Sequence, residues 1–337
     1  SLYDYPLSTA QIQSLSNELI TITPPIIHYT FDVDGTNSGT GGNTYDLSIP
    51  SALSLDSSNK KIGGKSLSIF SNGDLYTDEI HSGSPHYRVT SDTRIPPPPL
   101  TIPTAGWTIS FWSKKVTNSA RPYYVPIFTG QNTSAQKWQT STDYSTGSSL
   151  GNQVNLLLFD HSAGLSVSRI PVDDNFLLDN EWHHVVISYA AINTTTTVAT
   201  GYLDNVASTT TVTNSMIAGT SIDSLFGDVD DPSWEGYVDD FRIYDYAADA
   251  TTIDMIYKLG SNTDVASLSG LSVSTLQSVG ATPSQMLKTG ISLETLESEG
   301  LVTIVDFVGN TLTINNSTNP AAFIFPANHE MKNLTVT

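Results

Sequence analysis

The sequence predicts an antiparallel β-sandwich, followed by a small array of short helices and a partial β segment. Across residues 25–257, short runs rich in Val, Ile, Thr, Tyr and Phe alternate with clusters of Gly, Ser, Asn and Asp, which is typical of sandwich strands and their turns. Beyond residue 259, glycine recurs every ten residues from Gly270 to Gly300. This regular spacing indicates a repeated unit of a different kind.

The sandwich region contains several recognisable strands. Residues 154–159 and 184–189 are continuous apolar runs and are expected to be central strands, while residues 198–206 form a hairpin arm that ends in an Asp-Asn turn. Residues 94–100 include four prolines, which cannot donate ladder hydrogen bonds. We interpret them as a stiff surface connection, with a proline-rich ligand as the alternative. Residues 118–151 interrupt the strand rhythm and are expected to be irregular.

Each ten-residue unit in residues 260–300 predicts one short helix. Ser or Thr stands at each N-cap position, Thr282 with Gln285 fits a capping box, Pro283 occupies the first helical position, and glycine ends each helix in a left-handed turn. Helices of about seven residues are too short to be stable alone, so the units must stack. We expect N-caps at Ser272, Thr282 and Ser292 and buried side chains at Leu276, Leu287 and Leu296.

Composition excludes several classes of function. Lys+Arg 14 against Asp+Glu 33 gives a net charge of -19, which repels nucleic-acid phosphates and anionic membrane surfaces. The chain has no cysteine, so neither disulfides nor thiolate metal sites are expected. No apolar run approaches the ~20 residues that span a bilayer. Nucleic acid and membrane insertion are therefore not expected among its interactions.

Five segments together carry a family resemblance. They are residues 28–32, 63–70, 107–113, 181–186 and 234–244, and the last two contain Glu-Trp-His-His-Val-Val and Trp-Glu-Gly-Tyr-Val-Asp-Asp-Phe-Arg-Ile-Tyr. In this order and spacing they resemble laminin G-like domains of the concanavalin A-like lectin/glucanase superfamily, over residues 25–259. The resemblance implies a jelly-roll sandwich that binds ligands without catalysis.

The two ends of the chain suggest neighbouring modules. Tyr3-Asp4-Tyr5 repeats the pattern of Tyr244-Asp245-Tyr246, which in the family leads into a short closing helix. Residues 1–20 are therefore interpreted as the tail of a preceding similar domain, with a chance match of three residues as the alternative. Residues 301–337 regain a β pattern and are interpreted as the start or edge of a further domain.

Catalytic and zinc chemistry are weighed and not favoured. A glycoside hydrolase needs two facing carboxylates, and the Glu-x-Asp-x-x-Glu strand of laminarinase-like relatives is absent. The densest acidic group falls in a predicted loop with Pro232 and does not follow strand alternation. It therefore suits a solvated or cation-binding turn better than a catalytic site. His183 and His184 are adjacent on a strand, so they point to opposite faces and are not expected to share a metal. The acidic group consists of Asp228, Asp230, Asp231 and Glu235.

Calcium is the cofactor that the resemblance implies. In related sandwiches a structural calcium often joins the first strand to the last, and the matching positions are Asp32, Asp34 and Asp239. Strict alternation places Asp239 beside apolar residues such as Phe241, where an unpaired carboxylate would be costly. Either a cation must satisfy this carboxylate, or backbone amides or the neighbourhood of Arg242 must do so. Asp240 is the alternative ligand if a β-bulge shifts the register.

Aromatic residues in the irregular segment are the candidate glycan site. Sugars stack on aromatic faces, and the four candidates are surrounded by polar residues. Tryptophans that alternate with core residues are expected to be buried instead, and five Asn-x-Ser/Thr sequons are candidate glycosylation sites in a eukaryotic setting. The glycan candidates are Tyr123, Tyr124, Trp138 and Tyr144; the buried tryptophans are Trp107, Trp112, Trp182 and Trp234; the sequons begin at Asn132, Asn193, Asn315, Asn316 and Asn333.

These observations favour a non-catalytic binding or adhesion module of a large modular surface protein. Its expected partners are glycans or other surface proteins, together with neighbouring modules of the same polypeptide, in an extracellular, cell-surface or virion setting. A different class of function is a purely structural assembly protein that recognises only protein neighbours. A glycoside hydrolase relative is a less favoured alternative.

Overall fold

The structure is a computed structural model of the 337-residue chain, and it divides into two compact units. One unit is Thr23–Ser261, and the other combines Ser1–Ile22 with Asn262–Thr337. The structure describes residues 22–49, 53–69, 75–81, 84–89, 100, 105–115, 125–131, 137–144, 154–160, 166–172, 179–193, 196–212, 221–226, 236–302, 312–314 and 334–336.

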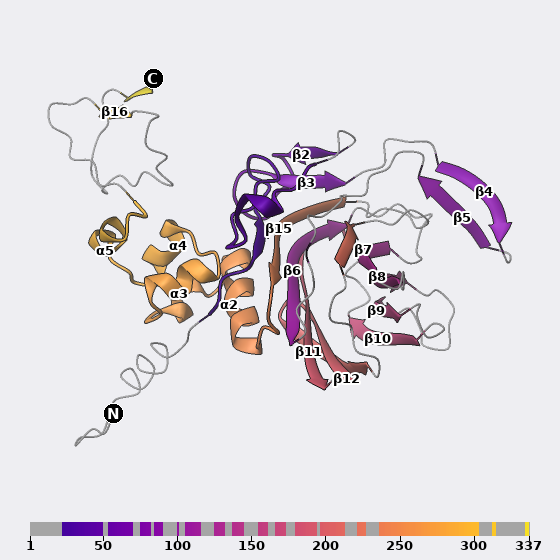
Figure 1. Ribbon diagram of the computed structural model, residues 1–337. Coiled ribbons are helices and arrows are strands. Elements are labelled where there is room, and N and C mark those ends of the chain that lie inside the picture. Colours follow the sequence, from indigo (N-terminus) through magenta and orange to yellow (C-terminus); the bar gives the residue numbers. More distant parts are fainter. Residues whose placement is uncertain are drawn as a thin grey trace, which may run out of the picture. The chain divides into compact units, whose positions relative to one another are not determined.

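An eight-stranded sheet forms one layer of the first unit (Figure 1). Its strand order is β13-β12-β11-β6-β15-β3-β2, with β1 also paired to β15, and all of its pairings are antiparallel. The strands are β1 (Ile27–Tyr29), β2 (Ser54–Asp56), β3 (Ser66–Ile69), β6 (Gly106–Lys115), β11 (His183–Asn193), β12 (Thr196–Leu203), β13 (Val206–Val212) and β15 (Gly236–Tyr244).

A five-stranded antiparallel sheet forms the facing layer, in the order β10-β9-β8-β7-β14 (Figure 1). Its strands are β7 (Val125–Gln131), β8 (Lys137–Tyr144), β9 (Val154–Asp160), β10 (Ser166–Val172) and β14 (Ser221–Leu225). A separate hairpin joins β4 (Leu75–His81) to β5 (Ser84–Val89). The two layers confirm the predicted antiparallel sandwich.

The core lies on the inner face of the larger sheet. Phe111 of β6 and Phe241 of β15 are fully buried, and both contact Phe226, which follows β14 of the other sheet. The ring centroids lie 5.4 Å and 5.7 Å from that of Phe226, in edge-to-face geometry. Trp107, near the start of β6, stacks on Tyr189 with ring centroids 4.7 Å apart, and this pair belongs to the core at that end of the strand. Among the described residues, apolar side chains of the larger sheet thus pack against Leu225 and Phe226 of the facing layer.

A helix covers part of the outer face of the larger sheet. Helix α2 (Ala250–Ser261) follows β15 and buries Ile253 against Val186 and Tyr202. Gly260 lies so close to the indole nitrogen of Trp112 that a Cβ atom would collide with it. This close approach explains why the helix carries glycine at a position where alanine is otherwise favoured.

Several strand predictions are confirmed, and two need correction. The first strand ends at Tyr29, before the expected residue 32, because Phe31 adopts a left-handed φ of 56°. The predicted irregular segment contains two strands, β7 and β8, so Ser and Thr alternation there supports strands. The Asp-Asn turn is confirmed, with Asp204 and Asn205 at φ 48° and 68°.

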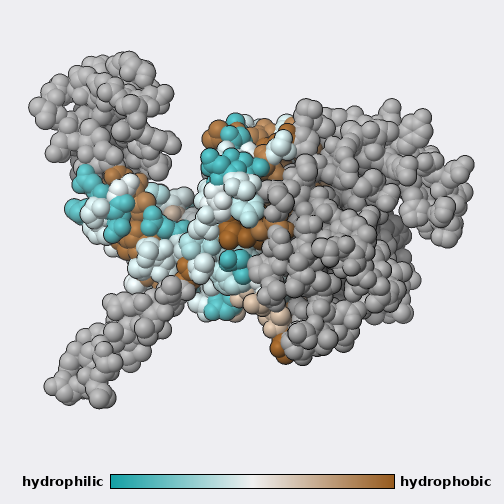
Figure 2. Space-filling view, viewed as in Figure 1, coloured by the Kyte–Doolittle hydropathy of each residue, from teal (hydrophilic) through white to brown (hydrophobic). Residues whose placement is uncertain are grey.

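The second unit contains the predicted helical array. Its helices are η3 (Val265–Leu268), α3 (Val273–Ser278), α4 (Pro283–Lys288) and α5 (Leu293–Ser298), and the four repeat glycines have φ between 69° and 93°. The hydroxyls of Ser272, Thr282 and Ser292 accept the expected N-cap hydrogen bonds, and Thr282 with Gln285 forms a complete capping box. On the face shown in Figure 2, hydrophilic and hydrophobic residues are interspersed over these helices.

One expected buried position in the array is wrong. Met286 is 1% exposed, whereas Leu287 is partly exposed. The buried residue stands four positions after each N-cap, as with Leu276 and Leu296, which are fully buried. Counting from Thr282 gives Met286, so the N-cap sets the buried register. A short parallel pair of β16 (Leu312–Ile314) and β17 (Leu334–Val336) follows the array. None of the helices in the described residues has the length and apolar character needed to cross a membrane.

Candidate functional site

A β-bulge in β15 organises the polar residues of the larger sheet. The pairing of β15 with β6 shifts register between Asp239 and Arg242, and Asp240 has a left-handed φ of 50°. The extra residue places Val238 and Phe241 in the core and leaves Asp239 off the core face. The strict alternation expected from the sequence, with Asp239 on the face of Phe241, is therefore wrong.

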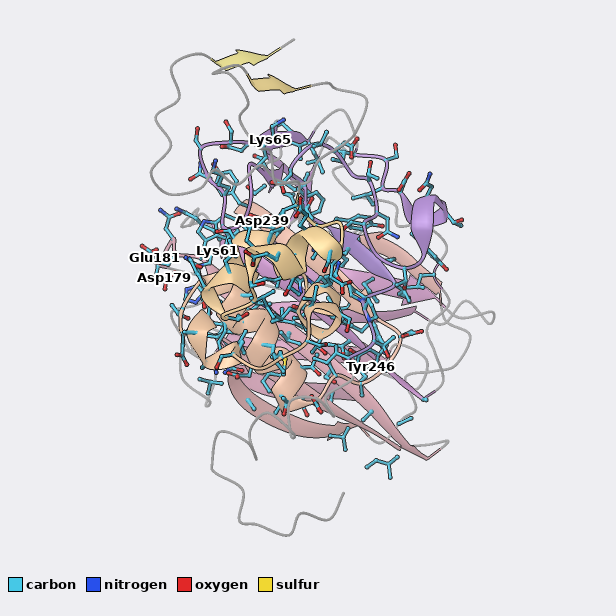
Figure 3. The ribbon with its side chains drawn as sticks, turned by 90° about the vertical axis from the view of Figure 1, so that its left-hand side faces the viewer. Lys61, Lys65, Asp179, Glu181, Asp239 and Tyr246 are labelled. Atoms are coloured by element: carbon cyan, nitrogen blue, oxygen red, sulfur yellow. The ribbon has the colours of Figure 1, made fainter. Side chains whose placement is uncertain are left out.

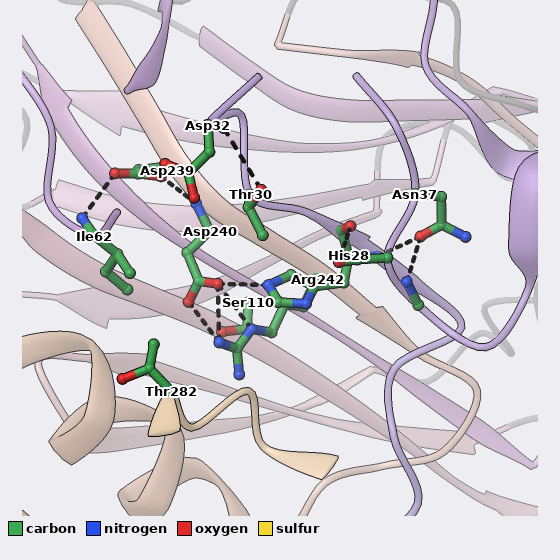
Figure 4. A network of polar contacts seen from close by, with 12 residues as sticks. His28, Thr30, Asp32, Asn37, Ile62, Ser110, Asp239, Asp240, Arg242 and Thr282 are labelled. Atoms are coloured by element: carbon green, nitrogen blue, oxygen red, sulfur yellow. Dashed lines mark hydrogen bonds and ion pairs between the residues drawn. The ribbon is translucent and has the colours of Figure 1, made fainter. Parts of the chain in front are cut away.

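Asp239 is fully buried and is satisfied by backbone amides (Figure 4). Its Oδ2 accepts the N–H of Lys61 at 2.8 Å and the N–H of Ile62 at 2.9 Å, and its Oδ1 accepts the N–H of Asp240 at 2.8 Å. Burial raises the pKa of Asp239 to about 8, although these amide donors oppose the shift. Asp239 thus fastens the loop before β3 to the bulge in β15.

Asp240 and Arg242 form a buried ion pair beside His28 (Figure 4). Arg242 Nη2 lies 2.8 Å from both oxygens of Asp240, Arg242 Nε lies 3.1 Å from Oδ1, and His28 Nε2 lies 2.7 Å from Oδ1. Burial opposes ionisation of Asp240, but the Arg242 charge and the His28 hydrogen bond outweigh it and lower its pKa to about 2. Burial and the Arg242 charge lower the pKa of His28, so His28 is neutral and donates its Nε2–H.

The two adjacent histidines have separate surroundings. His184 is fully buried, its Nε2 lies 2.9 Å from Ser110 Oγ, and its ring stacks on Trp112 at 4.9 Å. Burial lowers the pKa of His184 to about 3, which keeps it neutral. His183 instead lies between two carboxylates, with Nδ1 2.6 Å from Asp204 and Nε2 2.9 Å from Asp179. The two imidazoles do not converge, as the alternation of a strand requires.

Both nitrogens of His183 face carboxylate oxygens, so the imidazolium form satisfies both contacts. Burial lowers the pKa of His183, but the hydrogen bonds and charges of Asp204 and Asp179 outweigh it and raise the pKa overall. The backbone N–H of Glu181 also donates to Asp179 at 3.0 Å. His183 therefore ties the segment that precedes β11 to the turn at Asp204.

The three residues predicted to bind calcium have individual backbone partners. Asp32 Oδ1 accepts the N–H groups of Gly64 and Lys65, and Asp34 Oδ1 accepts the N–H of Thr36 at 2.8 Å on an exposed turn. Within the described ranges, no three His, Cys, Asp or Glu side chains are placed to hold one metal ion. The described geometry does not fit a calcium shared by Asp32, Asp34 and Asp239, and calcium binding stays a prediction. Backbone amides satisfy Asp239, and Asp240 is engaged by Arg242.

The predicted glycan and glycosylation residues are only partly covered by the structure. Trp138 and Tyr144 lie on β8, not in a loop, because the polar segment around them forms a strand. Asn193 is the last residue of β11. Tyr123, Tyr124, Asn132, Asn315, Asn316, Asn333, Trp234 and the acidic group Asp228, Asp230, Asp231 and Glu235 lie outside the described residues.

Two of the predicted buried tryptophans are confirmed and one is wrong. Trp107 and Trp112 are each 1% exposed, whereas Trp182 is partly exposed and faces the ring of Tyr237, with centroids 6.4 Å apart. Trp182 stands one residue before β11, where alternation no longer guarantees burial. The sequence prediction also missed the Asp240–Arg242–His28 network, which depends on the bulge. The Asp-Asp-Phe-Arg pattern of residues 239–242 was the sequence signal available for this network.

Comparisons with known proteins give one family and several distant structures. Residues 88–254 match the family model of the concanavalin A-like lectin/glucanases superfamily. No curated protein matches the chain. Domain 4 of AbnA, a GH43 extracellular arabinanase from Geobacillus stearothermophilus solved with arabinotriose, is 19% identical, with a TM-score of 0.39; the match covers 68% of this chain and 97% of that domain.

Botulinum neurotoxin binding domains also match. The serotype D binding domain is 12% identical with a TM-score of 0.42, and the match covers 70% of this chain and 50% of that chain. The type DC binding domain solved with rat synaptotagmin II is 14% identical with a TM-score of 0.38, over 72% of this chain and 51% of that chain. This chain thus spans about half the length of those binding domains. Residues 88–254 of this chain are thus similar to the concanavalin A-like lectin/glucanase superfamily, and the two antiparallel layers agree with the jelly-roll sandwich of that superfamily.

Proposed function

We propose that this chain is a non-catalytic, glycan-binding module of a large surface protein. The superfamily of its sandwich includes both lectins and glucanases, so the fold alone leaves binding and hydrolysis as candidates. The observation that carries the proposal is the commitment of the buried carboxylates to the fold. Asp239 accepts hydrogen bonds from backbone amides, and Asp240 contacts Arg242 and His28.

Hydrolysis makes demands that these carboxylates do not meet. A glycosidase requires two carboxyl groups facing each other across a sugar, about 5 to 10 Å apart, with one of them free to transfer a proton. Asp240 is held ionised by Arg242, which removes it as a proton donor near neutral pH. Asp239 accepts three amide hydrogen bonds and is fully buried, so it has no access to a substrate. The ionised state of Asp240 and the burial of Asp239 therefore support a binding function over a catalytic one.

The surface setting rests on composition and organisation. A net charge of -19 disfavours nucleic acid as a partner, so sugars and proteins are the remaining classes of macromolecule. The capped helical units of residues 262–302 form a repeat that recurs at a fixed spacing, as in modular proteins. We therefore place the chain in an extracellular, cell-surface or virion protein, next to other modules.

A binding and hydrolysis screen with the whole chain tests the function. Neutral, carboxylated and sulfated oligosaccharides are titrated by isothermal calorimetry, and the same sugars are incubated with the protein and assayed for new reducing ends. We expect saturable binding of at least one sugar without any release of reducing ends. Release of reducing ends would identify a hydrolase and contradict the proposal. Absence of binding throughout the panel would leave the purely structural alternative as the better account.

A further inference from the structure

We propose that Trp182, Lys114 and Tyr237 form a subsite for a negatively charged sugar, which rests on the proposed glycan-binding function. Lys114 lies on β6, Tyr237 lies on β15, and Trp182 directly precedes β11; these are three neighbouring strands of the larger sheet. The predicted aromatic residues of the irregular segment are not part of this subsite.

The strand register brings the three residues into one row. Tyr237 is directly opposite Lys114 in the β15–β6 pair, and His183 is directly opposite Ser113 in the β11–β6 pair. The next position of β6 is Lys114 and the residue before His183 is Trp182, so Trp182 comes level with Lys114. Directly opposite residues in antiparallel strands project from the same face. Lys114 therefore lies between two aromatic residues on the outer face.

The two rings approach each other across β6. Their centroids lie 6.4 Å apart and their planes are inclined by 45°, although their strands are separated by β6. Both side chains are partly exposed. The Tyr237 hydroxyl accepts a hydrogen bond from the Asn59 amide at 3.0 Å, which fixes this ring. A tilted and fixed aromatic pair offers a sugar two apolar faces at little entropic cost.

Charged residues of both signs surround this pair: Asp56 acts on Tyr237, and Glu181 and Asp204 act on Lys61. The loop before β3 supplies exposed Lys60 and also Lys61, whose backbone is held by Asp239 and whose ammonium lies 4.2 Å from the centroid of the Trp112 ring. Lys114 adds a third ammonium. Within the described part of the chain, no ion pair between a carboxylate and any of these three lysines occurs at salt-bridge distance. Lys114, which the strand register places between the two aromatic residues, matches a sugar that carries a carboxylate or sulfate group.

Acidic residues border the pair on one side. Asp179, Glu181 and Lys61 lie near one another at the same edge of the molecule (Figure 3). Asp179 is held by His183, which offsets its charge, and Glu181 is exposed. A free carboxylate beside an aromatic ring accepts hydrogen bonds from sugar hydroxyls. The border therefore favours a sugar with hydroxyls on one side and an anionic group toward the lysines.

The position of Trp182 is fixed before any ligand arrives. The preceding segment is held by the contacts of His183 with Asp179 and Asp204, and Asn180 adopts a left-handed φ of 59°. The Glu181 N–H also donates to Asp179 at 3.0 Å. Because these contacts order the segment in the free protein, binding requires little further ordering.

Calorimetric titration of the whole chain tests this subsite. The probes are a galacturonate trisaccharide, a sulfated galactose trisaccharide and a neutral galactose trisaccharide. We expect one or both charged probes to bind more tightly than the neutral probe, and the stronger of them tells a carboxylate from a sulfate preference. Equal or tighter binding of the neutral probe would overturn the charge assignment.

Single-residue variants test where on the protein the charged probe binds. We expect Trp182→Ala and Lys114→Gln each to weaken binding of the charged probe by about tenfold or more, and Trp182→Phe to retain most of it. Lys288→Gln removes one charge from the other unit and is the matched control, with unchanged affinity expected. If Trp182→Ala is unfolded by circular dichroism, Lys114→Gln decides the outcome.

The result that overturns the subsite is distinct from the one that overturns the proposed function. Full affinity in Trp182→Ala or in Lys114→Gln, or its loss in Trp138→Ala alone, would place sugar binding elsewhere and leave the proposed function standing. No binding of these probes or of any other panel sugar would overturn both.

Discussion

Replacement of Arg242 by methionine is the sharpest test of the buried polar network. Methionine keeps an unbranched stem and removes the guanidinium, which contacts Asp240 at 2.8 Å, 2.8 Å and 3.1 Å. Asp240 and Arg242 are each 3% exposed, so water cannot replace the lost partner. His28 remains as a hydrogen-bond donor to Asp240.

The expected cost follows from leaving a buried carboxylate without its cation. Breaking a buried pair on one side costs about 3–5 kcal/mol in the free energy of unfolding. In a unit of this size each 1 kcal/mol lowers Tm by roughly 2–4 °C, so the expected decrease in Tm is on the order of 6–20 °C. The size of this decrease exceeds the effect of most surface substitutions.

Thermal and urea unfolding measure this cost through the near-ultraviolet dichroism of the buried tryptophans. The double variant Asp240→Asn with Arg242→Met removes both charges, and asparagine tolerates the left-handed φ of 50° at this position. We therefore expect the double variant to be less destabilised than the sum of the two single variants. A cost below about 1 kcal/mol for Arg242→Met, or strict additivity in the double variant, would refute the account.

Three further predictions concern Asp239, calcium and α2. The pKa of Asp239 in the folded state is raised to about 8. Between the usual pKa of an aspartate and pH 8, the folded state therefore holds a proton that the unfolded state has released. The free energy of unfolding then falls as the pH rises, by up to about 1.4 kcal/mol per pH unit. Asp239→Asn should flatten the dependence of the unfolding free energy on pH, and an unchanged slope would contradict it. Calcium binding predicts a higher Tm in calcium than in excess chelator, and equal values would reject it. Gly260→Ala should cost about 1–3 kcal/mol in urea unfolding, since its Cβ collides with Trp112; an unchanged midpoint would mean that α2 moves without cost.

Local sequence signals anticipated much of the fold. Caps at Ser272, Thr282 and Ser292 depend on residues three positions apart, and the strand at residues 184–189 depends on a continuous apolar run. These features are local, so propensity and spacing suffice. The errors arose where a local rule was extended too far. Leu287 was expected to be buried as the leucine of its unit, but the position four residues after the N-cap is Met286; Trp182 was expected to be buried by an alternation that does not extend before the start of β11.

Less of the candidate site than of the fold could be predicted from the sequence. Asp239 was predicted to need partners, and backbone amides were one of the alternatives to a cation. The choice between amides and a cation depends on the loop before β3, which is 178 positions away from Asp239 at Lys61. A contact between residues so far apart in the sequence cannot be predicted from the local pattern around either residue.

The sequence by itself determined the antiparallel sandwich, the capped helices and the acidic character of this protein, because each depends on composition or on residues a few positions apart. Only the tertiary structure decided the roles of Asp239, Asp240 and Trp182. The bulge changes which face each residue of β15 occupies, and strand pairing brings Trp182, Lys114 and Tyr237 into one row. Register between distant strands is a property of the whole sheet, and it assigns these side chains to ion pairs, amide contacts or an exposed surface.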